Sequence, residues 1–225
     1  MTPTPARKPA RTPAAAARRR KPAQRRMPRE ERRAQILAKA REFFAENGLG
    51  AQTRALADAC GVSQRLLYSV FPSKSALLEE VYREHIAGPF RETWIDTLKD
   101  RRRPMEDRLV EFYRTYYDEV TTRGWLRLFL HASLAEVTMA PAYIAAVITR
   151  MLGVVVAEAA REQGLRAPRD KAVANELGWV LHGAVSHLAI RRHVYGNDNP
   201  MPPHEVIAMQ VRVFLGGLRA VLPPA

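Results

Sequence analysis

The segment from Thr53 to Lys74, TRALADACGVSQRLLYSVFPSK, leaves room for only two short helices. Gly61 interrupts the first helical pattern, and Pro72 ends the second because proline lacks a backbone N–H. At about 100° per residue, Leu67 and Phe71 lie on one face of the second helix and form its buried stripe. Two helices joined by a short glycine turn, with the second one exposed, are typical of a helix-turn-helix.

The outward face of the second helix carries side chains that can recognise bases. They are Gln64, Arg65, Leu66, Tyr68 and Ser69. Arginine can bind guanine, glutamine can bind adenine, and an aliphatic tip can contact the thymine methyl group. Phenol and hydroxyl groups can bind phosphate oxygens. The pattern therefore predicts a helix that enters the major groove of double-stranded DNA.

Capping residues and two cations mark the starts of these helices. Thr53, Ser63 and Ser73 are each expected to cap a helix through the side-chain hydroxyl. Lys74 lies in the first turn of the helix that Ser73 is expected to cap. The helix dipole disfavours a cation there unless an anion is bound. Lys74 is therefore the strongest candidate for a phosphate contact. Arg54 is placed similarly, although a surface arginine with no role explains it equally well.

The chain on both sides of this segment is also helical in pattern, with no strand alternation. A helix is expected from Pro28 to Asn47, and six longer helices follow Ser73 at about 74–99, 105–122, 125–138, 141–164, 168–194 and 203–221. The prediction is an all-α protein with nine helices. It divides into an N-terminal three-helix helix-turn-helix domain (29–89, with the helix-turn-helix at about 52–71) and a six-helix C-terminal domain (90–225).

The positive charge lies mainly at the N-terminus. The net charge is +13, and residues 1–28 contain nine Lys or Arg and no acidic residue. This segment is too poor in apolar side chains to offset its ordering entropy, which predicts a disordered basic arm. Its arginines either bind DNA or only make the chain soluble, and translation starting at Met27 is a further alternative.

Other features limit the compartment and the kind of site. Cys60 is the single cysteine, so no intrachain disulfide can form. No apolar run spans a membrane, because Thr149, Arg150 and Glu158 interrupt the longest one, and no secretory signal is present. We therefore expect a cytoplasmic protein. His182 and His187 are five residues apart, which does not suit one helix face, so neither a metal site nor a cofactor is expected.

Residues 29–89 resemble the DNA-binding domain of the TetR family of bacterial transcriptional regulators. The residues that carry the resemblance are Phe44, Gly48, Thr53, Arg54, Leu56, Ala57, Gly61, Val62, Ser63, Leu67, Tyr68, Phe71, Ser73, Lys74, Leu77 and Leu78. It implies a DNA-binding set in which Thr53, Tyr68 and Lys74 contact phosphates. In the same set Arg54, Gln64, Arg65, Leu66 and Ser69 face bases, and Ser63 begins the recognition helix. Val70 departs from the family pattern of His or Tyr, so one phosphate contact is expected to be missing.

The resemblance also implies a C-terminal domain for ligand binding and dimerisation. The helices at about 168–194 and 203–221 would form a four-helix bundle with a second chain. Small residues of the first would allow close approach: Ala172, Ala174, Gly178, Gly183, Ala184, Ser186 and Ala189. The last helix has an apolar face of Val206, Ile207, Val211, Phe214, Leu215 and Leu218. An ordinary intrachain core is the alternative for both sets. A homodimer would place two recognition helices on the half-sites of a palindromic operator.

A pocket for an unknown small-molecule effector is expected among the middle helices. The candidate lining residues are Trp94, Tyr113, Tyr116, Trp125, Phe129, His131, Met139, Tyr143 and Trp179, although each aromatic alone is also explained as core. The function expected is therefore a ligand-released homodimeric repressor. A non-specific architectural DNA-binding protein is the first alternative. A small-molecule enzyme is the second, but the sequence has no Gly-rich phosphate loop, nucleophile elbow or HExxH motif.

Overall fold

The computed structural model describes residues 27–90, 92–135, 142–197 and 200–225, and over these ranges it is helical with no β-strand. The α-helices are α1 (Arg29–Asn47), α2 (Thr53–Ala59), α3 (Gln64–Val70), α4 (Lys74–Tyr82), α5 (Glu92–Lys99), α6 (Met105–Thr115), α7 (Arg123–Leu134), α9 (Thr149–Glu162), α10 (Lys171–His193) and α11 (Pro203–Val221). Three π-helical turns are η1 (Arg83–Ala87), η2 (Tyr116–Val120) and η3 (Ile144–Ile148). The all-α prediction is confirmed. The greater part of the predicted basic arm, residues 1–26, lies outside the described residues.

The helix expected over 74–99 is two helices. α4 continues through η1 to Ala87, and α5 begins at Glu92. The backbone N–H of Gly88 still donates to the carbonyl oxygen of Arg83, but Pro89 has no N–H with which to extend the helix. The described residues therefore form ten α-helices rather than the nine expected.

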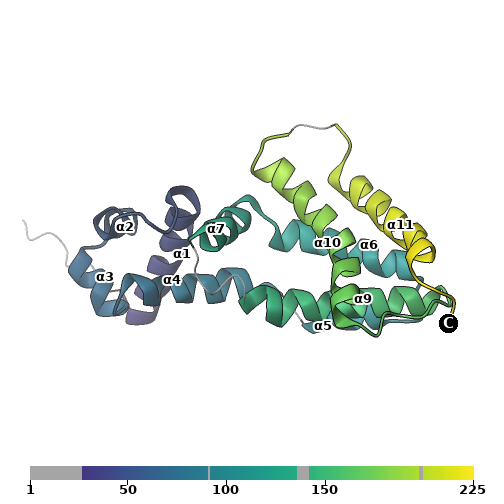
Figure 1. The fold of residues 1–225 in the computed structure, drawn as a ribbon. Helices are drawn as coiled ribbons and strands as arrows, with labels where there is room; N and C mark the ends of the chain where they lie inside the picture. Colours follow the sequence, from purple (N-terminus) through teal and green to yellow (C-terminus); the bar gives the residue numbers. More distant parts are fainter. Residues whose placement is uncertain (1–26, 91, 136–141, 198–199) are drawn as a thin grey trace, which may run out of the picture.

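Figure 1 shows the four N-terminal helices gathered at one end of the molecule, with α2 and α3 outermost. Helices α5, α6, α9, α10 and α11 gather at the other end. Helix α7 lies beside α1 and also contacts α10, so it connects the two groups. Helix α3 and the C-terminal group of helices are thus far apart, with α7 and the α4–η1 helix between them.

The N-terminal domain is held by the apolar face of α1. Ile36, Ala40 and Phe44, spaced four residues apart, are fully buried. Leu56 of α2 and Leu67 of α3 are buried against the same core. This core fixes the orientation of α2 and α3, and Leu67 is buried as the sequence predicted.

A buried arginine joins three helices at the far end of the C-terminal domain. The guanidinium of Arg108 on α6 is fully buried, and it donates to the carbonyl oxygen of Leu98 at 2.6 Å and to a carboxylate oxygen of Glu162 at 2.7 Å. Glu158 of α9 accepts two hydrogen bonds from Arg101, which hold the pKa of its carboxyl below the usual range. These contacts tie α5, α6 and α9 together.

Helix α11 buries most of its candidate dimer face against its own chain, whereas α10 buries only two of its seven candidate small residues, Gly178 and Ala189. Val206, Ile207, Val211, Phe214 and Leu218 are buried, and α11 contacts α6 and α10. A β-carbon on Gly178 would lie 2.6 Å from the Leu152 β-carbon, so this glycine serves the α9–α10 contact. The buried residues follow the intrachain alternative, whereas Ala172 is exposed and Ala174, Gly183, Ala184, Ser186 and Leu215 are half-buried. Other apolar side chains of α10 and α11 remain exposed: Val173, Val180, Met209, Val213 and Val221.

Candidate nucleic-acid interface and ligand cavity

Helix α3 is set in place by one cap and two buried side chains. The Ser63 hydroxyl accepts from the Leu66 N–H at 3.2 Å, which confirms the predicted cap. Leu67 and Phe71 are 1% and 2% exposed and anchor the inner face. Gly61 has a φ of 68°, which allows the tight turn between α2 and α3. The remaining face of α3 is directed away from the core.

The structure brings the predicted base-contacting residues together on that outer face. Gln64, Arg65, Leu66 and Ser69 of α3 and Arg54 of α2 are all exposed. The Ser69 hydroxyl donates to the Leu66 carbonyl oxygen at 2.7 Å, so its proton is used within the helix. In Figure 1 these two helices are the outermost part of the N-terminal domain, so a DNA duplex could reach both.

The predicted phosphate-contacting residues interact with one another across the helix-turn-helix. Tyr68 on α3 is 42% exposed, and its hydroxyl lies 3.3 Å from the hydroxyl of Thr53 on α2. The prediction that Thr53 caps α2 is wrong, because Gln52 holds the cap position and makes no side-chain cap. The Thr53 hydroxyl instead meets Tyr68, fifteen residues later in the chain.

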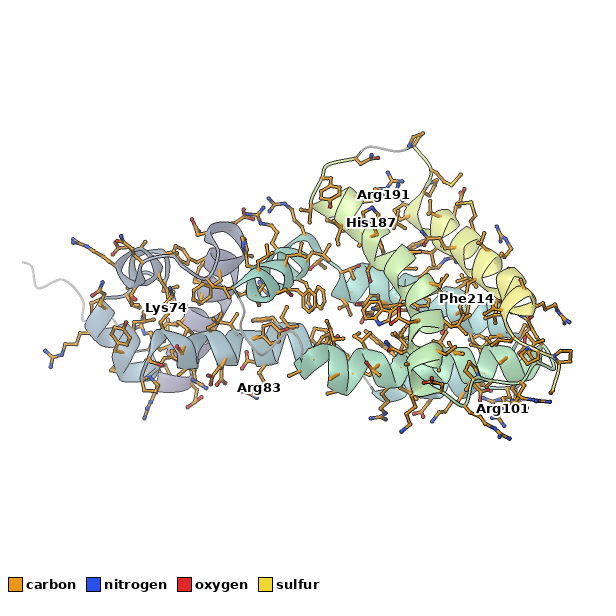
Figure 2. The ribbon with its side chains drawn as sticks, viewed as in Figure 1. Lys74, Arg83, Arg101, His187, Arg191 and Phe214 are labelled. Carbon is orange, nitrogen blue, oxygen red and sulfur yellow. The ribbon has the colours of Figure 1, made fainter. Side chains whose placement is uncertain are left out.

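Lys74 is tied to the loop before α2. Its ammonium donates to the Ala51 carbonyl oxygen at 2.5 Å, and the side chain is half-buried (Figure 2). Ser73 caps α4 by accepting from the Ala76 N–H at 3.0 Å, as predicted. An ammonium has three N–H donors, so Lys74 can hold the loop and still offer two donors to a phosphate. Val70, which the family pattern placed against phosphate, is half-buried against the core.

Helix α7 holds the C-terminal end of α1. Arg127 donates from Nε to the Ala45 carbonyl oxygen at 2.6 Å and from Nη2 to the Glu46 carbonyl oxygen at 3.0 Å. Arg123 pairs with the Glu46 carboxylate. His131 lies against Gly48, so the structure places it here and not in the predicted pocket. The role of Arg127 could not be predicted from the sequence, because its partners lie about eighty residues earlier.

A cavity of about 110 Å³ lies on the other side of α7. Its lining residues are Tyr116, Thr121, Trp125, Leu126, Phe129, Leu130, Tyr143, Ile144, Ile148, Trp179, His182, Ser186 and Ile190. Five of the nine predicted residues are among them: Tyr116, Trp125, Phe129, Tyr143 and Trp179. The others differ. Trp94 packs on Phe90 and Phe112, Tyr113 is buried behind the lining, His131 faces α1, and Met139 lies outside the described residues.

His182 also lines the cavity, and it was not among the lining residues predicted from the sequence. The imidazole of His182 is 2% exposed, and the rings of Tyr116 and Trp179 each lie 5.2 Å from it. Burial lowers the pKa of His182 to about 4, so the ring is neutral near pH 7. Its Nδ1 and the hydroxyls of Tyr113 and Tyr143 have no hydrogen-bond partner within the described part of the chain.

A larger hollow of about 530 Å³ opens at the junction of α1 and α7, and charged side chains line it. Glu42 and Glu46 belong to this lining, and each is already paired, with Lys39 and Arg123 respectively. The larger hollow also has one buried polar atom without a partner, the Nε2 of His85, but the smaller cavity combines aromatic walls with two such atoms and no Lys, Arg, Asp or Glu in its lining, so it is the better candidate for a ligand.

The described ranges contain neither a candidate metal site nor a candidate membrane-spanning helix. No three His, Cys, Asp or Glu side chains gather there in an arrangement that could hold a metal ion. No helix among them has the length and apolar character needed to cross a bilayer.

Comparison with known proteins connects this geometry to a family. Residues 36–81 match the model of bacterial regulatory proteins of the tetR family. The chain is 28% identical over 200 residues to the HTH-type transcriptional activator FasR of Mycolicibacterium smegmatis, covering 87% of each protein. A TetR-like regulator from Rhodococcus sp. RHA1 shares the fold with a TM-score of 0.64 and 16% identity, over 87% of this chain and all of that one. A tetR-family regulator from Streptomyces coelicolor matches with a TM-score of 0.57 and 19% identity, over 86% and 84%.

Proposed function

We propose that this member of the TetR family of transcriptional regulators binds a palindromic operator as a homodimer and releases it when a small molecule enters the cavity beside α7. The observation that carries the proposal is the outer face of α3. It exposes Gln64, Arg65 and Leu66 together, while Leu67 and Phe71 are buried. A guanidinium, an amide and an aliphatic tip on one exposed helix are suited to the edges of base pairs in the major groove.

Phosphate contacts would position this helix. Thr53, Tyr68 and Lys74 lie on α2, α3 and α4, and each reaches another part of the helix-turn-helix by a hydrogen bond. The Tyr68–Thr53 and Lys74–Ala51 hydrogen bonds hold these side chains in place, so little side-chain freedom would be lost on binding. Phosphate contacts of this kind fix the register of a protein on DNA but carry no sequence information.

A homodimer is proposed on the basis of the apolar side chains that α10 and α11 leave exposed. Val180 and Val213 are 61% and 70% exposed, although other apolar residues of both helices are buried in the core. Removing such side chains from water favours association with a second copy through α10 and α11. One recognition helix contacts only a few base pairs, whereas two can bind half-sites about 34–36 Å apart.

Ligand control is proposed on the basis of the position of α7. Trp125 and Phe129 of α7 line the cavity, while Arg127 of the same helix holds the end of α1. A ligand larger than the present cavity would displace α7 and with it the support of the helix-turn-helix. Movement of the helix that begins at Lys74 is a second route to the same effect, and the contacts of Arg127 favour α7. Ligand and DNA would then favour different arrangements of one element, which is the condition for coupling.

Whether the protein represses or activates transcription is a separate question from DNA binding. FasR of M. smegmatis is named as an activator, whereas the ligand-released form expected for this chain is a repressor. The position of the operator relative to the promoter, mapped by footprinting, would test that expectation. An operator upstream of the promoter elements that supports transcription only when bound would contradict it.

The experiment that tests the proposal begins with selection of DNA sites from a random pool by the purified protein. We expect a palindrome and an affinity for it at least about 1,000-fold above that for scrambled duplex at physiological salt. An architectural protein would instead bind both duplexes almost equally, with a steep salt dependence. That result would contradict the proposed function.

A further inference from the structure

The cavity beside α7 has uncharged walls. No Lys, Arg, Asp or Glu is among the lining residues that the structure describes. His182 is the basic group in the lining, and burial keeps it neutral at pH 7 by lowering its pKa to about 4. A charged group that entered such surroundings would lose its hydration and find no opposite charge, which is strongly unfavourable.

The same walls hold hydrogen-bonding atoms that lack partners. The Tyr143 hydroxyl and the His182 Nδ1 are both buried and unpaired, and both residues line the cavity. Tyr143 is 5% exposed and His182 is 2% exposed, so bulk water does not supply the missing bonds. A buried polar atom without a partner destabilises the fold, unless a ligand or an ordered water binds it.

Aromatic faces make up much of the remaining wall. The rings of Trp125 and Phe129 are stacked with centroids 4.9 Å apart, and Tyr143 meets Phe129 edge to face at 6.3 Å. The volume of about 110 Å³ is somewhat below that of an engineered apolar cavity that binds benzene, about 150 Å³. One aromatic ring or a short aliphatic chain would therefore fit after a small outward shift.

We propose that the cavity binds an uncharged, mainly apolar molecule that carries one hydroxyl or carbonyl group, and that Tyr143 and His182 hydrogen-bond this group. The inference rests on the proposed function in taking this cavity as the effector site. A ligand hydroxyl would donate to the His182 Nδ1 and accept from the Tyr143 hydroxyl. Its apolar part would lie against Trp125, Phe129 and Trp179.

Three matched probes test the ligand class on the DNA-free protein at pH 7 by isothermal titration calorimetry. They are toluene, which is apolar; p-cresol, which adds one hydroxyl; and p-toluate, which replaces the hydroxyl with a carboxylate. We expect p-cresol to bind at least about fivefold more tightly than toluene, because its hydroxyl makes two hydrogen bonds that toluene lacks. We expect p-toluate to bind at least tenfold more weakly than p-cresol. Equal or tighter binding of p-toluate, or no binding of either neutral probe, would overturn the proposal.

Variants then assign the hydrogen bond to residues. Tyr143→Phe and His182→Phe should each reduce the p-cresol affinity toward that of toluene while leaving toluene binding in place. Toluene binding therefore shows that each variant still folds around a cavity. Tyr117→Phe is the matched control, because Tyr117 is a buried phenol outside the cavity lining. An unchanged preference for p-cresol in both Tyr143→Phe and His182→Phe would also overturn the assignment.

Operator binding is measured separately with the same probes, so the two hypotheses can fail independently. If p-cresol binds as expected and the operator affinity does not change, the proposed class of ligand is supported. The proposal that such ligands release the operator is then wrong. If operator binding is specific but only p-toluate binds in the cavity, DNA recognition holds and the ligand class is wrong.

Discussion

The Nε of Arg127 on α7 lies 2.6 Å from the carbonyl oxygen of Ala45 in the last turn of α1. The last four carbonyl groups of a helix have no partner within it, and a cation near them also interacts favourably with the helix dipole. Arg127 meets both requirements from a different domain. It is therefore a direct mechanical connection between the helix that lines the cavity and the helix that supports the helix-turn-helix.

Replacement of Arg127 should lower stability and weaken ligand control. Arg127→Ala removes two hydrogen bonds and an ion pair with Glu46 from a side chain that is 26% exposed, and we expect a loss of about 1–3 kcal/mol in the free energy of unfolding. Arg123→Ala is the control, because its pair with Glu46 is exposed on both sides and should contribute less than about 1 kcal/mol. Urea denaturation gives both values. Equal losses for the two variants would contradict a special role for Arg127.

Replacement of Arg65 should change which sequences are bound. Arg65 is exposed on α3, and Arg65→Ala should cost about 1–3 kcal/mol on the selected operator and relax the preference at one base pair of each half-site. Arg83→Ala removes an equal charge from η1, away from α3, and should leave the preference unchanged. Competition binding with single-base variants of the operator measures both effects. An unaltered preference in Arg65→Ala would remove Arg65 from base recognition.

Replacement of Lys74 should weaken binding to every sequence equally. Lys74→Met retains most of the apolar stem but loses the ammonium that holds Ala51. We expect the slope of log K against log salt to become shallower by about 1, with no change in the ratio of operator to scrambled affinity. Fluorescence anisotropy at four salt concentrations would measure both quantities. If the ratio of operator to scrambled affinity changes and the salt slope does not, Lys74 acts only by holding the loop before α2.

A charge on the exposed face of α11 should separate the two chains. The side chain of Val213 is 70% exposed, and Val213→Glu would place a carboxylate in the proposed apolar contact. Sedimentation equilibrium should then give a mass near 25.4 kDa, compared with twice that value for the unmodified protein. Leu134→Glu on α7 is the control, since Leu134 is 81% exposed and lies outside α10 and α11. If Val213→Glu retains the mass of a dimer, the contact lies elsewhere.

The buried His182 should make the protein sensitive to mild acid. Its pKa is about 4 in the folded chain and near 6.5 in the unfolded chain, so only the unfolded state takes up a proton as the pH falls from 7 to 5. Stability therefore falls with falling pH, and these two pKa values give a loss of about 2 kcal/mol over that range. Subtracting the pH profile of His182→Gln from that of the unmodified protein isolates the effect, because His85 and His193 also have lowered pKa values. If the pH profiles of the two proteins are parallel, the predicted contribution of His182 to the pH dependence of stability is wrong.

Local features of the fold could be predicted from the sequence, and contacts between distant segments could not. The caps at Ser63 and Ser73 were predicted correctly because each depends on a residue three positions away. The Thr53 cap was predicted wrongly, because the hydroxyl meets Tyr68 on another helix. The break at Pro89 was missed, although proline is a local signal, because the apolar pattern continued on both sides of it.

The candidate sites divide in the same way. The outer face of α3 followed from helical spacing alone, and the structure exposes the residues expected there. The cavity lining was only half predicted, because aromatic content cannot distinguish Trp125, which lines the cavity, from Trp94, which fills the core. The contacts of Lys74 with Ala51 and of Arg127 with Ala45 depend on how the chain folds back on itself.

Helix α7 carries cavity residues on one side and the support of α1 on the other. Natural selection for a new effector would act first on cavity residues such as Trp125 and Phe129, and a change of side-chain volume there would also move the helix that Arg127 occupies. Regulators that share this arrangement should therefore acquire new ligands together with altered basal expression of their targets. Compensating substitutions would then collect at the α1–α7 contact, far from both the ligand and the DNA.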